Sequence, residues 1–258
     1  MSAYNSPSTV LITGATGSIG SALAQAYAGA GQILFLQGRN TARLQEVAEF
    51  CRQKGAEVHT KVLDVRNLDE LRDWVSTVSQ ENTVDLLLPT AGINVNIGPN
   101  GQGETWEESS ALIEINLVAA MAVVDAALPA MRQRGSGQIG LFSSLAAYYG
   151  LPLTPSYSAS KAAIKAYGEA LRGWLAPEGI HVNVIMPGYV ESKMCREMPG
   201  PKPFLWSPER AAQVIKRRLA RNQARISFPF PLNLGTWYLA VLPSCISQRI
   251  LQLLGYGH

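Results

Sequence analysis

The stretch Thr9-Val-Leu-Ile-Thr-Gly-Ala-Thr-Gly-Ser-Ile-Gly20 decides the fold that we expect. A short apolar run leads straight into spaced glycines, and the helix-forming residues 21–28 follow. A strand, a glycine loop and a helix N-terminus in this order form a cradle for phosphate, because glycine allows close approach and the first helical N–H groups face the anion. The same glycines alone would indicate no more than a turn; the strand before them and the helix after them make the pattern informative.

Apolar runs and amphipathic stretches alternate along the rest of the chain. We expect strands at 33–36, 58–63, 84–88, 138–143, 180–186 and 225–228, and helices at 42–54, 68–79, 106–132, 155–175 and 207–222. This alternation predicts an α/β fold, a single-domain Rossmann-type doubly wound parallel sheet with helices on both faces. Ligands of such sheets bind at the carboxyl ends of the strands, where Gly17, Gly92, Ser144 and Pro187 fall.

Composition indicates one globular domain. The chain has 258 residues, of which 47% are hydrophobic and 16% charged, with a net charge of +3. That length supports a sizeable core, and that composition excludes a disordered chain. The charge is too small, and basic residues are too little interleaved with aromatics, to predict a nucleic-acid partner.

The cysteines and the N-terminus bear on metal sites and location. The 3 cysteines are far apart, with no Cys-x-x-Cys pair and no histidine cluster, so we expect no metal site. An odd, sparse count is typical of a reducing compartment. Residues 1–8 lack the basic start and apolar run of a signal peptide, so we expect a cytoplasmic location.

A second motif carries candidate chemistry. Tyr157 and Lys161 are four residues apart, which puts both on one face of a helix with Thr154 as a candidate N-cap and Pro155 as its first residue. A nearby ammonium and the positive end of the helix dipole should lower the tyrosine pKa, so that the phenol exchanges a proton near neutral pH. Alone, the Tyr-x-x-x-Lys spacing is common and indicates only an ordinary helix.

Two more polar residues accompany this pair. Ser144 ends an apolar strand and could hydrogen-bond the same substrate oxygen as Tyr157. Asn116 lies in an expected helix, where its amide could hold a water or a backbone group. Asn116, Ser144, Tyr157 and Lys161, in this order and spacing, resemble the catalytic set of the short-chain dehydrogenase/reductase family, and the resemblance extends from residue 10 to about residue 229.

The resemblance implies an NADP(H)-dependent oxidoreductase that interconverts a carbonyl and a secondary alcohol by hydride transfer. Tyr157 would act as general acid/base, Ser144 would orient the oxygen, Lys161 would also bind the nicotinamide ribose, and Asn116 would support a proton-relay water. Residues 1–230 would form the dinucleotide-binding and catalytic domain, and residues 231–258 an apolar tail.

Cofactor choice depends on the end of the second strand. Enzymes that bind NAD usually carry an acid there for the ribose 2′-OH, whereas this chain has Gly38 followed by Arg39. An arginine could pair with a 2′-phosphate, so we expect NADP, with NAD as the weaker alternative; Arg39 could instead be a solvated surface residue. The resemblance implies these cofactor-binding residues: Thr13, Gly14, Thr16, Gly17, Ser18, Ile19, Gly20, Arg39, Asn40, Asp64, Val65, Ala91, Gly92, Tyr157, Lys161, Pro187, Gly188, Val190 and Ser192. Asp64 could instead cap the following helix.

The chain departs from the family pattern at two places. Its glycine spacing, with Gly17 and then Ser18, is that of the extended branch of the family, which includes epimerases and dehydratases, but the chain is too short for the extra domain of that branch. Pro89 and Thr90 replace the usual asparagines before Ala91 and Gly92, so that loop must meet its hydrogen bonds differently. Two alternatives stay open: an NADP-binding regulatory protein without catalysis, and an epimerase or dehydratase.

The family pattern does not explain the C-terminal region. Residues 191–205 show no clear period and suit a mobile lid. Residues 232–242 are apolar nearly all round, Pro243 breaks the run, and an apolar stripe follows at helical spacing. The run is too short to span a bilayer, so the tail should cover the pocket, contact a second subunit or lie at a membrane surface. We expect a homo-oligomer and a hydrophobic substrate, with peripheral membrane contact as the alternative.

Overall fold

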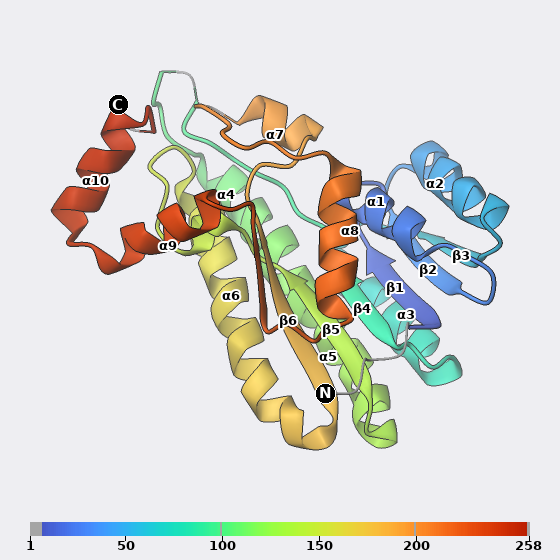
Figure 1. Cartoon of the computed structure of the whole chain (residues 1–258). Coiled ribbons are helices and arrows are strands. Elements are labelled where there is room, and N and C mark those ends of the chain that lie inside the picture. Colours follow the sequence, from blue (N-terminus) through green and yellow to red (C-terminus); the bar gives the residue numbers. More distant parts are fainter. Residues whose placement is uncertain (1–6, 99, 199, 257–258) are drawn as a thin grey trace.

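Seven parallel strands form the centre of the molecule (Figure 1). The structure, a computed structural model, describes residues 7–98, 100–198 and 200–256. The strand order is β3-β2-β1-β4-β5-β6-β7, and every neighbouring pair is parallel. The strands are β1 (Thr9–Thr13), β2 (Ile33–Gly38), β3 (Glu57–Val62), β4 (Leu86–Pro89), β5 (Gly137–Phe142), β6 (Ile180–Pro187) and β7 (Arg225–Phe228). The expected parallel sheet is therefore confirmed.

Helices cover both faces of the sheet. One core cluster joins β1, β2 and β4 to α1 (Ser18–Tyr27), α2 (Thr41–Gln53) and α8 (Pro208–Leu219). The other joins the opposite face to α3 (Leu68–Glu81), α5 (Ala119–Arg134) and α6 (Pro155–Leu175). Parallel strands buried on both faces need continuous apolar runs, and β1, β4 and β5 are buried along their whole lengths.

The strand order reverses between β1 and β4. β1 pairs with β2 on one side and with β4 on the other, so the loops that follow β1 and β4 leave the sheet in opposite directions. Such a reversal opens a crevice at the carboxyl ends of the strands. The glycine loop after β1 and the residues after β4 lie at this place, as the expected topology requires.

The long apolar helix is interrupted where Asn116 lies. α4 (Trp106–Ile113) passes through a π-helical turn, η1 (Glu114–Val118), into α5, rather than running as the single regular helix that we expected. π-Turns inside helices often occur at functional sites. By length and composition alone Trp106–Arg134 could cross a membrane, but Ile115, Val123 and Met131 pack in the core of this fold.

Three local expectations need correction. α1 begins at Ser18, three residues earlier than expected, so Ser18 lies in its first turn. Asn67, and not Asp64, caps α3, because the Asp64 carboxylate is held by Arg66. The segment that we expected to be irregular contains α7 (Lys193–Glu197), which Ser192 caps. The short 3-10 turns are η2 (Leu145–Ala147) and η3 (Ala176–Glu178).

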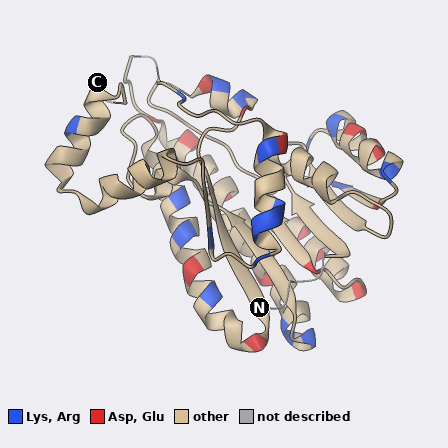
Figure 2. Ribbon diagram, in the orientation of Figure 1, with Lys and Arg blue, Asp and Glu red and all other residues tan. Residues whose placement is uncertain are grey.

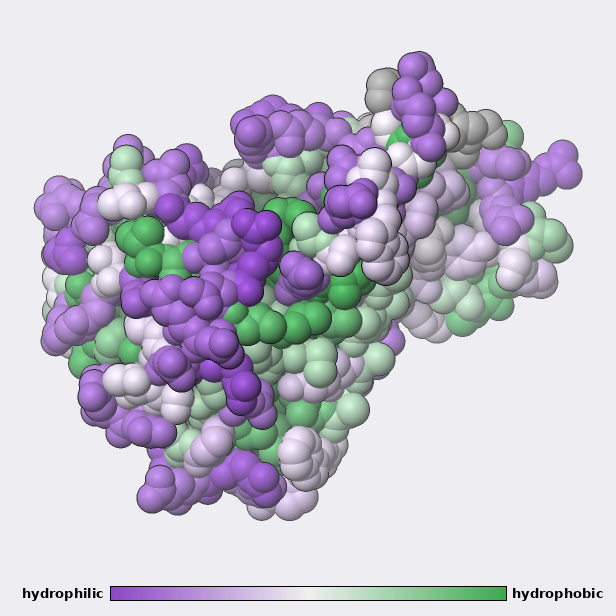
Figure 3. Space-filling model, turned by 180° about the vertical axis from the view of Figure 1, so that it is seen from behind, coloured by the Kyte–Doolittle hydropathy of each residue, from purple (hydrophilic) through white to green (hydrophobic). Residues whose placement is uncertain are grey.

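The C-terminal tail forms a helical hairpin beside the main body (Figure 1). α9 (Leu232–Val241) and α10 (Ser244–Leu253) are joined around Pro243, and the Ser247 hydroxyl donates to the Leu239 carbonyl at 2.7 Å. Seen from behind, the hairpin projects at the right and exposes hydrophobic surface (Figure 3). Its exposed apolar side chains include Leu234, Trp237, Tyr238, Val241 and Leu253.

Two glycines of α6 test how closely this helix packs on the sheet. A Cβ added at Gly168 would lie 2.7 Å from Val184 Cγ2 and 3.0 Å from Leu141 Cδ1, whereas one at Gly173 would meet nothing within 4 Å. Gly168→Ala should therefore lower the free energy of unfolding by about 1–3 kcal/mol through overpacking. Gly173→Ala should raise it by about 0.5–1 kcal/mol through helix propensity. Denaturant titration of both variants measures these changes; equal effects at the two positions would contradict the packing.

Candidate active site

Tyr157, Lys161 and Ser144 meet where α6 packs against the end of β5. The Lys161 ammonium donates to the Phe142 carbonyl at 3.0 Å, and the Ser143 hydroxyl donates to the Lys161 carbonyl at 2.7 Å. These two bonds fix Ser144, the next residue along the chain, beside the first turns of α6. Ser144 and Tyr157 are half-buried and both line one cavity, so the structure brings the three expected residues together.

The start of α6 is capped differently from our expectation. Pro155 is the first helical residue, as predicted, and Thr154 occupies the N-cap position. The Thr154 side chain makes no capping bond; instead, the Glu104 carboxylate accepts from the Ser156 N–H at 3.1 Å. A carboxylate at this place stabilises the positive end of the helix dipole from a residue more than 50 positions away, which no local pattern indicates.

The electrostatics of the pair differ from the expected lowering of the tyrosine pKa. Burial raises the pKa of Tyr157, and the interaction of its phenol with the Ser144 hydroxyl offsets this only in part. Burial also lowers the pKa of Lys161 to about 8. The Lys161 nitrogen lies 5.5 Å from the centre of the Tyr157 ring and is bonded to a carbonyl, so desolvation outweighs the attraction that the spacing suggested.

The side chain of Asn116 hydrogen-bonds to the backbone of the loop after β4. Its side-chain oxygen accepts from the Ile93 N–H at 2.8 Å, and its amide donates to the Ile93 carbonyl at 2.9 Å. The amide also lies 3.2 Å from the Ser160 hydroxyl on α6. Asn116 thus ties the π-turn to the loop after β4 and to the helix that carries Tyr157, which agrees with the backbone-binding alternative that we considered.

The cavity beside Tyr157 has a volume of about 350 Å³. The expected cofactor-binding residues that line it are Ile19, Gly92, Tyr157, Lys161, Pro187, Gly188, Val190 and Ser192. Residues from α9 and α10 complete its wall, among them Leu239 and Leu251. Residues of the tail therefore form part of the cavity wall.

A second cavity of about 200 Å³ lies over the glycine loop. Among the expected cofactor residues, it is lined by Gly14, Thr16, Gly17, Arg39, Val65, Ala91 and Gly92. Thr13, Ser18, Gly20, Asn40 and Asp64 line neither cavity. Asn40 caps α2, and a Cβ at Gly20 would lie 2.4 Å from the Gly14 carbonyl oxygen, so these two residues shape the loop and its surroundings.

The loop fits a pyrophosphate. Gly17 caps α1 without a side-chain bond, and the first turn of α1 carries no acid, whereas Asn40, Asn67 and Ser207 cap their helices with side chains. The leading N–H groups of α1 are thus left for an anion. Gly14 has a φ of +70°, and a Cβ there would lie 2.6 Å from Ala91, so only glycine allows this approach.

Two side chains hold the loop: that of Gln37, which we did not predict, and that of Thr90, which stands in place of an expected asparagine. Gln37 is buried at the end of β2; its side chain accepts from the Gly14 N–H at 3.0 Å and donates to the Leu63 carbonyl at 2.7 Å. The Thr90 hydroxyl donates to the Thr13 carbonyl at 2.7 Å, which meets the bonding need created by the missing asparagines. Gln37 could have been found from the sequence, because it is a polar residue at the end of an otherwise apolar strand.

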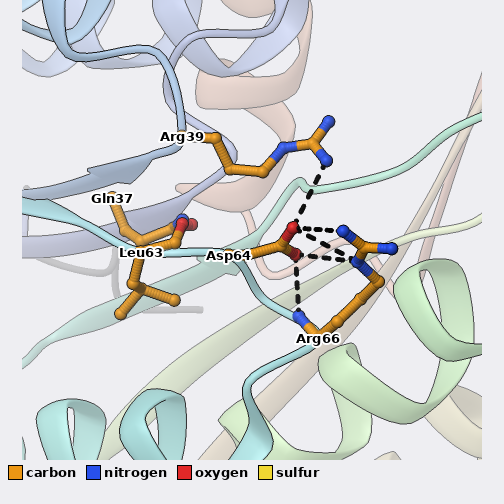
Figure 4. A network of polar contacts seen from close by, with 5 residues as sticks. All are labelled: Gln37, Arg39, Leu63, Asp64 and Arg66. Atoms are coloured by element: carbon orange, nitrogen blue, oxygen red, sulfur yellow. Dashed lines mark hydrogen bonds and ion pairs between the residues drawn. The ribbon is translucent and has the colours of Figure 1, made fainter.

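Arg39, which lines this second cavity, belongs to a network of charged contacts with Asp64 and Arg66 (Figure 4). Arg66 binds Asp64 through its guanidinium at 2.7 Å and holds the pKa of that carboxyl down, to about 2. Arg39 lies farther from the same carboxylate, at 3.5 Å, and its side chain is 57% exposed. Arg66 is therefore the main partner of the Asp64 carboxylate, and the Arg39 guanidinium keeps N–H donors that face solvent. Within residues 7–98, 100–198 and 200–256, no cluster of histidine, cysteine or acidic side chains could hold a metal.

Comparison with known proteins places this chain. Residues 8–201 match the family model of short chain dehydrogenases. An uncharacterized oxidoreductase of Myxococcus xanthus is 32% identical over 237 residues, which cover 92% of this chain and 93% of that protein. The 11-beta-hydroxysteroid dehydrogenase 1A of Arabidopsis thaliana is 36% identical over 187 residues, covering 72% of this chain and 53% of that protein.

Solved structures share the fold. A short-chain dehydrogenase from Sphingobium yanoikuyae in complex with NADPH superposes with a TM-score of 0.79 at 23% identity, covering 97% of this chain and 96% of that one. A short chain dehydrogenase from Burkholderia cenocepacia in complex with NADP gives 0.78 at 24% identity, covering 94% and 97%. The family match over most of the chain, the relative from Myxococcus and the shared fold agree: the chain belongs to the short-chain dehydrogenase family of oxidoreductases.

Proposed function

We propose that this protein is an NADP(H)-dependent oxidoreductase that interconverts a carbonyl and a secondary alcohol, with Tyr157 as the general acid/base. The observation that carries the proposal is the meeting of the Tyr157 and Ser144 hydroxyls in one cavity, with Lys161 buried one turn along α6. When bound, a nicotinamide supplies or accepts the hydride. The residues of the chain then have to position a carbonyl oxygen and move one proton.

The proton is held at the Tyr157 oxygen. Because burial raises its pKa, the phenol is protonated at neutral pH, which suits donation to an oxygen that becomes an alkoxide during reduction. The Ser144 hydroxyl accepts from the Ala146 N–H at 3.2 Å and donates to the Pro187 carbonyl only at a long 3.5 Å, so it can turn to donate to the same substrate oxygen. We propose that Asn116 supports this geometry by binding the backbone of Ile93. We propose in addition that it supports a proton-relay water.

Lys161 contributes positive charge close to the developing oxyanion. With a pKa of about 8, its ammonium form dominates at pH 7. Burying that charge destabilises the fold, and no hydrophobic benefit explains a lysine at this position. Its charge and its reach toward the nicotinamide ribose are therefore the proposed reasons for its presence.

The cofactor part of the proposal is a preference for NADP over NAD. Gly38 leaves no acid to bind a ribose 2′-OH or to repel a 2′-phosphate, and Arg39 lines the second cavity with exposed donors. A Cβ at Gly38 would lie 2.5 Å from Thr16 Cγ2, so an acid at this position would also have to displace Thr16. The NADP named for two neighbours of the same fold supports the preference without deciding it.

Association of copies also belongs to the proposal. We propose that residues 231–258 form a tail that is distinct from the catalytic residues 1–230. One side of α9 and of α10 lines the cavity. Their outer side leaves Trp237 and Tyr238 43% and 55% exposed. Exposed apolar surface of this kind usually marks an interface, and a second copy of this chain is the partner that we propose.

Removing the Tyr157 hydroxyl should abolish proton transfer and little else. We expect Tyr157→Phe to lower kcat for ketone reduction by about 100-fold or more, with NADPH affinity within a few-fold of the parent. Tyr167→Phe is the matched control, because Tyr167 lies on the same helix, half-buried, and lines neither cavity. Turnover by Tyr157→Phe close to that of the control variant would contradict the assignment.

Neutralising Arg39 should weaken NADPH binding selectively. We expect Arg39→Gln to raise the Kd for NADPH by about tenfold to a hundredfold, the range for losing a charge-assisted hydrogen bond, with the Kd for NADH nearly unchanged. Lys54→Gln, an exposed change at the other end of α2, controls for net charge. Fluorescence titration of both cofactors measures this. Tighter binding of NADH than of NADPH by the parent protein would refute the preference.

The buried ammonium should leave a mark on stability. The pKa of Lys161 falls from 10.5 to about 8 on folding, so between these values the unfolded chain binds more protons and stability rises with pH. Lys161→Met removes this dependence. We expect the stability of the parent relative to the variant to rise by at most about 3 kcal/mol between pH 7 and pH 10. A difference in the free energy of unfolding that does not change over this range would show that the ammonium is not buried at a cost.

A further inference from the structure

The wall of the larger cavity includes a hydrophobic cluster separate from the two main cores. Leu153, Leu239, Leu251 and Tyr256 are its buried members, each at most 9% exposed. Three of the four belong to the tail, and Leu153 lies just before α6. Leu239, Leu251 and Tyr256 line the cavity that Tyr157 also lines, so this part of the wall is packed as a core is packed.

Tyr256 holds this wall in place. Its hydroxyl donates to the Pro201 carbonyl at 2.6 Å and lies 3.0 Å from the Tyr189 hydroxyl. Its ring lies against Gly200, where an added Cβ would be 3.4 Å away. The last described residue of the chain therefore joins the tail to the segment between β6 and α8, so that segment and hairpin form one continuous wall.

The wall carries almost no charge. Lys161 is the one charged side chain among the described residues that line the cavity, and its ammonium is already bonded to a backbone carbonyl. α9 and α10 are uncharged except for Arg249, which does not line the cavity (Figure 2). A carboxylate or phosphate beside the tail residues, away from Lys161, would lose its water and gain no charged partner there.

The polar groups of the wall are also satisfied within the protein. The Thr236 hydroxyl donates to the Leu232 carbonyl at 3.1 Å, and the Ser192 hydroxyl both donates to the Val190 carbonyl and caps α7. The Tyr189 and Tyr256 hydroxyls bind each other. The Ser144 hydroxyl donates only at a long 3.5 Å to the Pro187 carbonyl and interacts with the Tyr157 phenol, so these two hydroxyls are the ones best suited to bind a substrate oxygen.

We propose that the substrate is a ketone, or the matching secondary alcohol, with one polar group and an uncharged hydrocarbon body that lies against α9 and α10. This inference rests on the proposed function and narrows it: the polar end of the cavity binds the reacting oxygen, and Leu239, Leu251 and Tyr256 select the body. Sugars, polyols and acids are excluded, because each further hydroxyl or charge would be desolvated against satisfied groups.

The cavity also limits the size of that body. The volume of the cavity is about 350 Å³, and a bound nicotinamide would share this space, because Pro187, Gly188 and Ser192, which we expect to bind the cofactor, also line it. Short ketones leave most of this apolar surface without contacts. Each added methylene should raise kcat/KM about four-fold, the change that corresponds to about 0.8 kcal/mol per buried methylene, until the cavity is filled.

A series of 2-alkanones tests the proposal on the intact protein with NADPH. We expect kcat/KM to rise steadily from butan-2-one to nonan-2-one. 8-Oxononanoate carries the same methyl ketone with a carboxylate at the far end, and we expect its kcat/KM to be about 100-fold or more below that of nonan-2-one. A flat series, or a keto acid that reacts as well as nonan-2-one, would overturn the inference while leaving the proposed function intact. No turnover of any ketone would refute the proposed function itself.

Variants of α10 locate the selection in the tail. Leu251→Ala removes a side chain that is 3% exposed and lines the cavity, whereas Leu253→Ala alters one that is 81% exposed and does not. We expect Leu251→Ala to lower kcat/KM for nonan-2-one about tenfold and for butan-2-one by no more than about twofold, with Leu253→Ala matching the parent on both. Equal losses on both ketones would overturn the role of the tail. If thermal melting shows that Leu251→Ala does not fold, Tyr256→Phe takes its place. We then expect a larger loss of kcat/KM on nonan-2-one than on butan-2-one, and equal losses would overturn the role of the tail.

Discussion

Two reciprocal hydrogen bonds between α6 and the end of β5 position the candidate active site. The Lys161 ammonium binds the Phe142 carbonyl at 3.0 Å, and the Ser143 hydroxyl binds the Lys161 carbonyl at 2.7 Å. Ser144 follows directly, so its hydroxyl can only lie beside the first turns of α6. Close packing at Gly168 reinforces this contact, because a side chain there would displace Leu141 of β5 as well as Val184 of β6. The chemistry that we propose depends on this one helix–strand contact.

The topology of the sheet connects that contact to the cofactor loop. Thr90, Gly92 and Ile93, which follow β4, line both cavities, so the phosphate cradle and the space beside Tyr157 meet at this segment. Asn116 holds Ile93 through two hydrogen bonds from the π-turn. A parallel sheet whose order reverses between β1 and β4 brings these pieces to one edge although they are far apart in the sequence.

The sequence predicts the sheet, most helices and the meeting of Ser144, Tyr157 and Lys161, because buried parallel strands and helical spacing leave strong local patterns. Features that depend on contacts between distant residues left no such pattern. The Glu104 cap of α6, the Gln37 bond to Gly14 and the interaction of Tyr256 with Tyr189 each join residues separated by more than 20 positions. The tyrosine pKa was expected to fall because spacing reports a neighbouring charge but not desolvation, which depends on the whole fold.

The proposed function requires this site to reduce a carbonyl with a nicotinamide as the hydride source. The most direct measurement follows the loss of NADPH absorbance when purified protein is mixed with an apolar ketone, together with chromatographic quantification of the alcohol. We expect one alcohol to form for each cofactor oxidised, with multiple turnovers per chain. Cofactor that binds but is not consumed, or that is consumed without alcohol, would contradict it.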